Sequence, residues 1–398
     1  LLTGALFLSK FLGLIYVIPF NELVGETGGT LFQFAYIPYN ILITISMVGL
    51  PLAVSKIVSR YNSLGDYKTG LKVLKLSSIL MLLTGFVSFL ILNLGADTFA
   101  KWMIVEYDSS DQITVDDIAH VLKMVSYAII IIPAMSVFRG FYQGYEFMEP
   151  SAISTVVEQF VRIIFLLVAT FLVIKVFDGT IATAVGYATF AAFIGGLASW
   201  LVLLFFWKKK KKHIDNQIQN QKSTYQLTTK DLIIELVSYA GPFIVVGMAT
   251  SLYQSIDQFT FQKAMIASGR VSEWVVAFGT INFYGHKIII LPVMIATGLS
   301  LSIIPALTAS LTKGETKVIH TQINQALQII AVFIIPSITG IAILSTVIYG
   351  SLFGLNDIAV SGPLLAWYAP ASLVISLFTV TASILQGLNE QRFVIVGL

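Results

Sequence analysis

Long apolar runs, separated by short polar segments, occupy most of this chain. A helix that crosses a membrane needs about 20 mostly apolar residues. The runs that meet this requirement lie at residues 1–20, 31–58, 71–94, 118–140, 151–176, 181–207, 232–255, 276–307, 323–349 and 361–385, and another begins near 393. They are too long for membrane strands and lack the alternation that such strands show. The pattern therefore predicts an all-α polytopic membrane protein.

Composition agrees with lipid as the main solvent. The chain is 56% hydrophobic and 11% charged, with a mean hydropathy of +0.85, whereas a soluble protein carries about 25% charged residues. It has no cysteine, and its four histidines show no metal-ligand spacing. Nucleotide-binding glycine patterns and a convincing Ser/His/Asp set are also absent. We therefore expect no enzyme, no cofactor, no metal and no nucleic-acid partner, and we expect the energy to come from an ion gradient or the membrane potential.

The distribution of charge predicts an orientation. Five consecutive lysines, at 208–212, follow the sixth apolar run, and positive charge marks the cytoplasmic side of a membrane protein. With that side taken as cytoplasmic, alternation of the runs places most loop Asp and Glu residues on the opposite side. The basic residues that fall on the cytoplasmic side with the lysines are Arg60, Lys68, Arg139, Lys313, Lys317 and Arg392. This predicts a cytoplasmic N-terminus in a bacterial plasma membrane.

The chain also reads as two related halves. The sequence Gly-Leu-Pro-Leu at 49–52 is similar to Gly-Leu-Ser-Leu at 298–301, and Tyr-Gln-Gly at 142–144 is similar to Leu-Gln-Gly at 385–387. The matching positions lie six helices apart, which predicts a parallel repeat around a central cavity. The predicted parts are an N-terminal lobe at 1–207, a cytoplasmic polar linker at 208–230 and a C-terminal lobe at 231–398. The last lobe is short and the chain does not begin with Met, so we expect a fragment of a longer protein.

Ionisable residues within the apolar runs are the candidate site. A charge at bilayer depth faces a cavity or a partner. Glu158 and Arg162 lie four residues apart on one helical face, so we expect them to pair with each other. The deep charges that remain are Lys10 and Lys287, for which reaching the membrane surface is the alternative. A cavity that these lysines line predicts an anionic ligand, and a diphosphate is the natural candidate. His286 is either a further donor to that ligand or a packed interface histidine.

The chain contains Ser-Lys-Phe-Leu-Gly at 9–13 and Tyr-Gly-His-Lys-Ile at 284–288, the latter followed by Pro292. These two stretches resemble the start of the first helix and the eighth helix of the MurJ (MviN-like) family of lipid II flippases. The residues at 139–144, Pro150 and 157–162 resemble the Gram-positive branch, near stage V sporulation protein B. The resemblance covers the whole chain.

The resemblance implies membership of the multidrug/oligosaccharidyl-lipid/polysaccharide exporter superfamily. The implied fold is MATE-like, with two parallel-repeat six-helix lobes and alternating access to a cationic cavity. The implied substrate is undecaprenyl-diphosphate carrying the peptidoglycan precursor, and the last helices, where the family binds the lipid tail, would be missing here. Lys10 and Lys287 stand where the family has functional arginines, and Tyr16 stands where it has another. The expected diphosphate site is Lys10, Lys287, Arg162 and Arg139, supported by Glu158, Gln143, Tyr16 and His286.

Other functions stay open on the sequence. One is a flippase for another lipid-linked polysaccharide precursor, which requires the same basic cavity. Another is a cation-coupled drug antiporter, which requires an acidic residue without a partner near the membrane centre. A third is a non-transporting scaffold for cell-wall synthesis. In every case we expect a monomer among membrane lipids.

Overall fold

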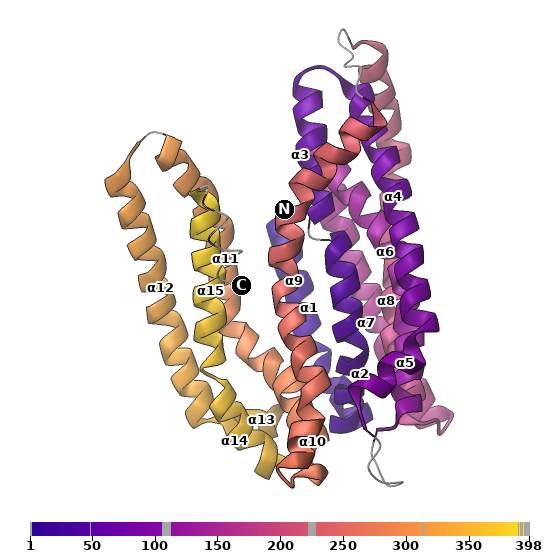
Figure 1. Ribbon diagram of the computed structural model, residues 1–398, viewed down its shortest axis with the longest axis vertical. Coiled ribbons are helices and arrows are strands. Elements are labelled where there is room, and N and C mark those ends of the chain that lie inside the picture. The colour runs from indigo at the N-terminus through magenta and orange to yellow at the C-terminus, as the bar shows by residue number, and fades with distance from the viewer. Residues whose placement is uncertain are drawn as a thin grey trace. The chain divides into compact units, whose positions relative to one another are not determined.

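The computed structural model describes residues 2–47, 49–105, 113–221, 228–312, 314–388, 390 and 393, and every element in these ranges is a helix (Figure 1). The elements in chain order are α1 (Leu2–Ile15), α2 (Val17–Met47), α3 (Gly49–Ser63), α4 (Tyr67–Leu94), α5 (Ala96–Met103), α6 (Val115–Gly144), α7 (Met148–Phe171), η1 (Leu172–Val176), α8 (Ile181–Gln219), α9 (Thr229–Ala267), η2 (Val271–Glu273), α10 (Trp274–Gly279), η3 (Thr280–Tyr284), α11 (Gly285–Thr312), α12 (Thr316–Ile343), α13 (Ser345–Phe353), α14 (Ile358–Tyr368) and α15 (Ala371–Gly387).

Seven helical segments of the described chain are long and apolar enough to cross a membrane. They are Tyr67–Leu94, Val115–Gly144, Met148–Val176, Ile181–Gln219, Val271–Ser300, Thr316–Ile343 and Ile358–Gly387. Each coincides with one of the predicted apolar runs. The runs predicted at 1–20, 31–58 and 232–255 lie along α1 to α3 and α9, which include positions outside the described residues, as does most of the run near 393.

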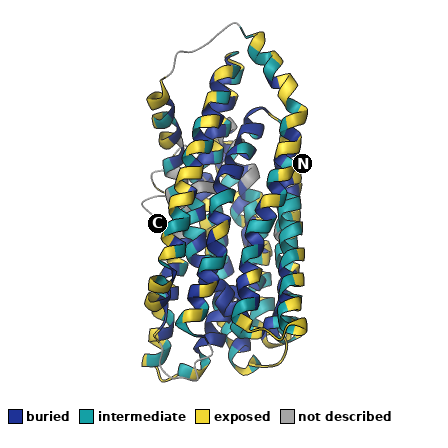
Figure 2. Cartoon of the chain, turned by 90° about the vertical axis from the view of Figure 1, so that its right-hand side faces the viewer, coloured by how far each residue is buried: buried dark blue, intermediate teal, exposed yellow. Residues whose placement is uncertain are grey.

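The chain divides into two compact units, Leu1–Ala267 and Ser268–Leu398. In the first unit, α6 packs against α2, α3, α4 and α8. Its apolar stretch is 67% buried, compared with 22% for α4 and 17% for the helix that contains α7. Figure 2 shows exposed residues along the outward faces of the helices, with buried residues between them. Helices that are apolar on both the inner and the outer face are typical of a bundle in lipid.

The expected linker at 208–230 is helical over its first part. Residues 208–219, including all five lysines, continue α8 as one helix. No Gly or Pro interrupts this stretch, and Lys and Gln are good helix formers. The next helix, α9, packs against α2 and α3 and so belongs to the first compact unit. The division into lobes at this linker stays a prediction.

Helices of the second unit repeat those of the first at a constant spacing. The helix α12 begins at Thr316 and α4 at Tyr67, while α13 begins at Ser345 and α5 at Ala96, so each lies 249 residues after its counterpart. The pair 298–301 and 49–52, which suggested the repeat in the sequence, has the same spacing. An unbroken alignment of this kind is typical of an internal duplication.

The turn that precedes α4 and α12 is also the same in both copies. Gly65 and Gly314 adopt positive φ angles of 78° and 72°. Each glycine amide donates to the carbonyl three residues earlier, at 3.0 Å in both copies. The following amides, of Asp66 and Glu315, each donate to the carbonyl five residues earlier, at 2.9 and 3.0 Å. Glycine is suited to this position because side chains disfavour positive φ.

A close helix contact recurs as well. Gly144 of α6 lies against α3, where an added Cβ would be 2.7 Å from the Ser55 carbonyl oxygen. Gly387 of α15 lies against α11, where an added Cβ would be 3.2 Å from the Ile304 carbonyl oxygen. Ser55 and Ile304 are again 249 residues apart. The two Gln-Gly stretches noticed in the sequence therefore end helices that pack in the same way within their own units.

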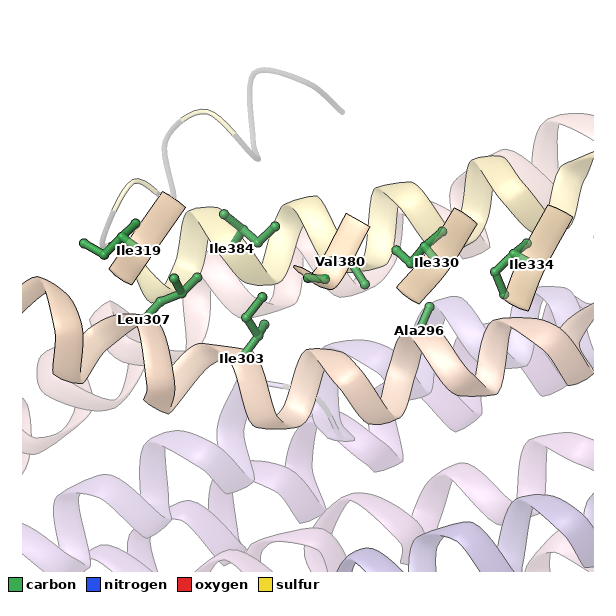
Figure 3. Close-up of a cluster of buried hydrophobic side chains, with 9 residues drawn as sticks. Ala296, Ile303, Leu307, Ile319, Ile330, Ile334, Val380 and Ile384 are labelled. Atoms are coloured by element: carbon green, nitrogen blue, oxygen red, sulfur yellow. The ribbon is translucent and has the colours of Figure 1, made fainter. Parts of the chain in front are cut away.

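The second unit has its own apolar core between α11, α12 and α15. Figure 3 shows side chains from these three helices converging on one cluster. Its members recur mainly at spacings of four and seven residues, which places them on one face of each helix. The buried residues of this cluster are Ala296, Ile303, Leu307, Ile319, Ala326, Ile330, Ile334, Val380 and Ile384.

Candidate functional site

A buried ion pair joins three helices of the first unit. The Arg139 Nη2 atom of α6 lies 2.7 Å from a carboxylate oxygen of Glu158 on α7, and their side chains are 11% and 14% exposed. Arg139 also donates to the Ser154 hydroxyl of α7 at 2.9 Å and to the Ser199 hydroxyl of α8 at 2.8 Å. Charge-assisted bonds of this kind are stronger than neutral ones. The guanidinium therefore fastens α6, α7 and α8 together.

A glycine lets α7 and α8 approach closely at this level. A Cβ added to Gly195 of α8 would be 2.7 Å from the Glu158 carbonyl oxygen and 2.9 Å from Arg162 Cβ. Small residues at helix contacts allow backbones in membrane bundles to approach each other. Gly195 thus permits the short distance between α7 and α8 beside Glu158 and Arg162.

The expected pairing of Glu158 with Arg162 is wrong. Glu158 instead pairs with Arg139, and the Arg162 Nη2 atom donates to the Tyr36 hydroxyl of α2. The Arg162 guanidinium also lies over the Tyr36 ring, 5.1 Å from its centroid. A spacing of four places Glu158 and Arg162 on one face of the helix, but the groups that other helices bring to that face select the partners.

The surroundings of Arg162 are aromatic and phenolic. Tyr36 stacks on Phe32 with ring centroids 4.4 Å apart, and its ring meets that of Tyr39 edge-on at 5.2 Å. Tyr16 and Tyr39 lie within electrostatic range of Arg162. Tyr16 is buried at the break between α1 and α2. Arg162 itself is only half-buried, so this region presents a cation whose hydrogen-bond partner is a neutral phenol.

The structure gives fewer contacts for the remaining predicted site residues of the first unit. Gln143 is half-buried near the end of α6, one turn after Arg139. The Lys10 side chain lies outside the described residues, but its helix, α1, packs against α7. An added Cβ at Gly13 would be 3.2 Å from the Gln159 amide nitrogen of α7. Roles for Lys10, Gln143 and Arg139 at a ligand stay predictions.

In the second unit, Lys287 and His286 lie in the first turn of α11, directly after the π-helical turn η3. Single π-turns inside helices often occur at functional sites. The Nδ1 atom of His286 lies 2.9 Å from the Tyr368 hydroxyl of α14. This contact fits the interpretation of His286 as a packed interface histidine. Lys287 is half-buried, and its role at a ligand stays a prediction, as does its pairing with Lys10.

The sequence reasoning missed Tyr36, Ser154 and Ser199. A tyrosine or serine in an apolar run carries no charge and is common, so nothing marked these three. Among the residues that the structure describes, no group of three or more His, Cys, Asp or Glu side chains is arranged to hold a metal ion.

Comparison with known proteins places this geometry among membrane transporters. The family model described as a polysaccharide biosynthesis protein matches residues 1–310. The lipid II flippase MurJ of Bacillus subtilis (strain 168) is 44% identical over 399 residues, covering 100% of this chain and 73% of that protein. Stage V sporulation protein B of the same organism is 26% identical, covering 83% of this chain and 61% of that protein.

Solved structures of transporters share the fold. An inward-facing MATE family transporter of the MOP superfamily matches with a TM-score of 0.73 at 15% identity, covering 98% of this chain and 82% of that chain. An outward-facing conformation of a MATE family transporter matches with a TM-score of 0.66 at 14% identity, covering 99% of this chain and 82% of that chain. The predicted all-α, MATE-like membrane fold is confirmed.

Proposed function

The chain belongs to the polysaccharide biosynthesis protein family, and we propose that it is a flippase that moves lipid II, the undecaprenyl-diphosphate-linked peptidoglycan precursor, across the bacterial plasma membrane by alternating access. The resemblance that the sequence suggested is confirmed, because the chain is 44% identical along its whole length to a lipid II flippase. On the same basis we place it among transporters rather than enzymes.

The observation that carries the proposed site is the burial of Arg162 and the identity of its hydrogen-bond partner. Its guanidinium lies on a membrane helix, is half-buried, and donates to a phenol instead of a carboxylate. A bond between Arg and a phosphate oxygen is charge-assisted and therefore stronger than one to a neutral hydroxyl. A diphosphate that reaches Arg162 thus displaces Tyr36, while an uncharged lipid does not.

The ion pair beside Arg162 supports this role. Glu158 lies one turn from Arg162, and without Arg139 its carboxylate would be available to neutralise that cation. With Arg139 as its partner at 2.7 Å, Glu158 leaves Arg162 to the ligand. Lys10, on the helix that packs against α7, would add a point charge to this diphosphate, without the planar fork with which Arg grips phosphate. Lys287 is proposed as a further diphosphate ligand from the second unit.

Orientation, oligomeric state and energy source complete the proposal. The lysine-rich end of α8 and the positive-inside rule favour a cytoplasmic N-terminus. We also propose that the protein is a monomer. Because no nucleotide-binding pattern occurs in the sequence, we propose coupling to an ion gradient or to the membrane potential, which supplies about 2.3 kcal/mol per charge and 100 mV.

A flippase for another lipid-linked glycan would use the same cations, so growth has to separate the two. The two acids that the sequence marked for a cation antiporter are poorly placed for that role. Glu158 is paired with Arg139, and Asp257 is exposed, so neither offers a dry carboxylate for a cation.

The test is complementation of a bacterial strain depleted of its lipid II flippase. The complete protein that contains this chain is expected to restore growth. Arg162→Ala, Lys10→Ala and Lys287→Ala are expected to lose that ability at matched membrane levels. Lys175→Ala is the matched control, because Lys175 is exposed in η1.

Two outcomes would contradict the proposal. Failure of the well-expressed parent to restore growth would point to another lipid-linked glycan. Restored growth with all three variants would remove the diphosphate site while leaving a transporter.

A further inference from the structure

The strongest unexplained contact in the first unit joins α9 to α2. Gln258 of α9 is 1% exposed. Its side-chain nitrogen donates to the Phe34 carbonyl oxygen of α2 at 2.9 Å and lies 3.2 Å from the Met103 sulfur. A buried amide that reaches the backbone of another helix is unusual, because helical carbonyls normally have a donor four residues later.

Pro38 explains why this carbonyl needs a donor. It lies four residues after Phe34, within α2, and proline has no amide hydrogen to give. A membrane helix tolerates proline where a neighbouring side chain satisfies the carbonyl that the proline leaves without its donor. Gln258 performs this task from α9, and so it supports the turn of α2 that Pro38 leaves one backbone hydrogen bond short.

The same turn of α2 carries the partner of Arg162. Tyr36 lies between Phe34 and Pro38, its ring is stacked on Phe32 at 4.4 Å, and its hydroxyl accepts from Arg162. The direction in which Tyr36 points therefore depends on the backbone of the turn that Gln258 holds.

Packing alone does not account for Gln258. The side-chain oxygen of the amide is buried without a hydrogen-bond partner, and burying an unsatisfied acceptor is destabilising. The helix is also fastened to its unit elsewhere. Gln262 exchanges two hydrogen bonds with the Val105 backbone, at 2.8 and 3.1 Å, and Glu235 pairs with Arg60 at 2.9 Å.

We propose that Gln258 is a positioning residue for the Arg162 site, because it caps the Phe34 carbonyl that Pro38 leaves without a donor and thereby holds the turn of α2 that presents Tyr36 to Arg162. This inference rests on the proposed function, in which Arg162 receives the diphosphate. It makes α9 part of the binding region of the first unit, through the backbone of α2 rather than by contact with the ligand.

The first test needs no substrate. Tyr36→Phe removes the hydroxyl that Arg162 binds, and we expect it to lower the melting temperature of the purified complete protein. In a Gln258→Leu background we expect that shift to shrink to half or less, because Tyr36 is then no longer held in place. Gln262→Leu is the matched control, since it removes hydrogen bonds of α9 to Val105 that do not reach α2, and the shift from Tyr36→Phe should persist in it. An equal shift in all three backgrounds would overturn the proposal.

The second test separates positioning from support of the backbone. Pro38→Ala returns an amide donor to the Phe34 carbonyl, so the double variant Pro38→Ala/Gln258→Leu should melt near the wild-type temperature. Because this turn of α2 is then no longer held by α9, and Tyr36 with it, we expect flipping of fluorescent lipid II in proteoliposomes to fall about tenfold, which is about 1.4 kcal/mol. Flipping at the wild-type rate by the double variant would show that Gln258 only satisfies a carbonyl. If the wild-type protein does not flip lipid II at all, the proposed function fails, and the melting experiment still decides the role of Gln258.

Discussion

Glu158 and Arg139 form an ion pair between α7 and α6 with a 2.7 Å contact, although Arg162 stands one turn away from Glu158 on the same helix. This pair distinguishes the roles of two arginines that look equivalent in the sequence. Arg139 is surrounded by a carboxylate and two hydroxyls and joins helices. Arg162 donates to a phenol, and a phosphate can replace that partner.

Removing one partner of this pair should destabilise the first unit. Glu158→Leu leaves the Arg139 charge buried without a counter-ion, which costs about 3–5 kcal/mol in comparable sites. Replacing both residues, as in Arg139→Met/Glu158→Leu, should recover most of that loss because neither charge remains. Unfolding of the purified protein, followed by circular dichroism, measures both effects. A double variant no more stable than Glu158→Leu would show that the hydroxyl contacts of Arg139, and not the pair, hold the helices.

The two repeat copies should differ in their tolerance of a methyl group. Gly144→Ala places a Cβ 2.7 Å from both the Ser55 carbonyl oxygen and Val58 Cβ, so α6 and α3 must separate, at a cost of about 1–3 kcal/mol. At Gly387 the nearest atom would be Leu307 Cβ at 3.0 Å, so Gly387→Ala should cost less.

The matched control for these variants is Gly340→Ala in α12, where nothing lies within 4 Å of the added atom. It should be neutral or slightly stabilising, because alanine is the better helix former. Thermal melting of the three variants ranks them, and an equal loss at Gly144 and Gly387 would contradict the geometry.

The start of α9 should respond to acid. Two hydrogen bonds from Thr228, from its hydroxyl at 2.6 Å and its amide at 3.0 Å, hold the pKa of Asp231 below its ordinary value of 3.8. A carboxyl group with a lowered pKa stabilises the fold above its unfolded pKa, and this contribution is lost as the pH falls through the folded pKa. The helix start should therefore keep its full stability above about pH 4 to 5 and lose this contribution below that range.

A carboxyl titration followed by NMR measures this effect. Thr228→Ala removes the hydroxyl donor and should move the pKa of Asp231 back toward 3.8. Asp231→Asn, which does not titrate, is the control for stability and should remove this part of the acid dependence. A pKa that Thr228→Ala leaves unchanged would assign the shift to another group.

The internal repeat shows what short sequence matches can indicate about the fold. Two stretches of a few residues indicated a duplication. The structure shows the same turn and helix starts 249 residues apart, and the same kind of glycine contact at Gly144 and Gly387. The sequence match is weak because apolar residues replace one another in lipid with little cost. The backbone geometry persists because a positive φ and a close contact each require a specific residue.

The sequence by itself determined the class of this protein. Apolar runs of membrane length predict helices whatever their partners, since lipid offers the backbone no hydrogen bonds, and a deep charge such as Arg162 is costly enough to mark a site. Only the tertiary structure decided which groups meet. Periodicity states which face of α7 carries Glu158 and Arg162. It does not state that Arg139 reaches Glu158 from the preceding helix, or that Tyr36 and Gln258 reach their partners from helices far away in the chain. Those contacts depend on how α2, α6, α7 and α9 pack, and no local pattern in the chain encodes that packing.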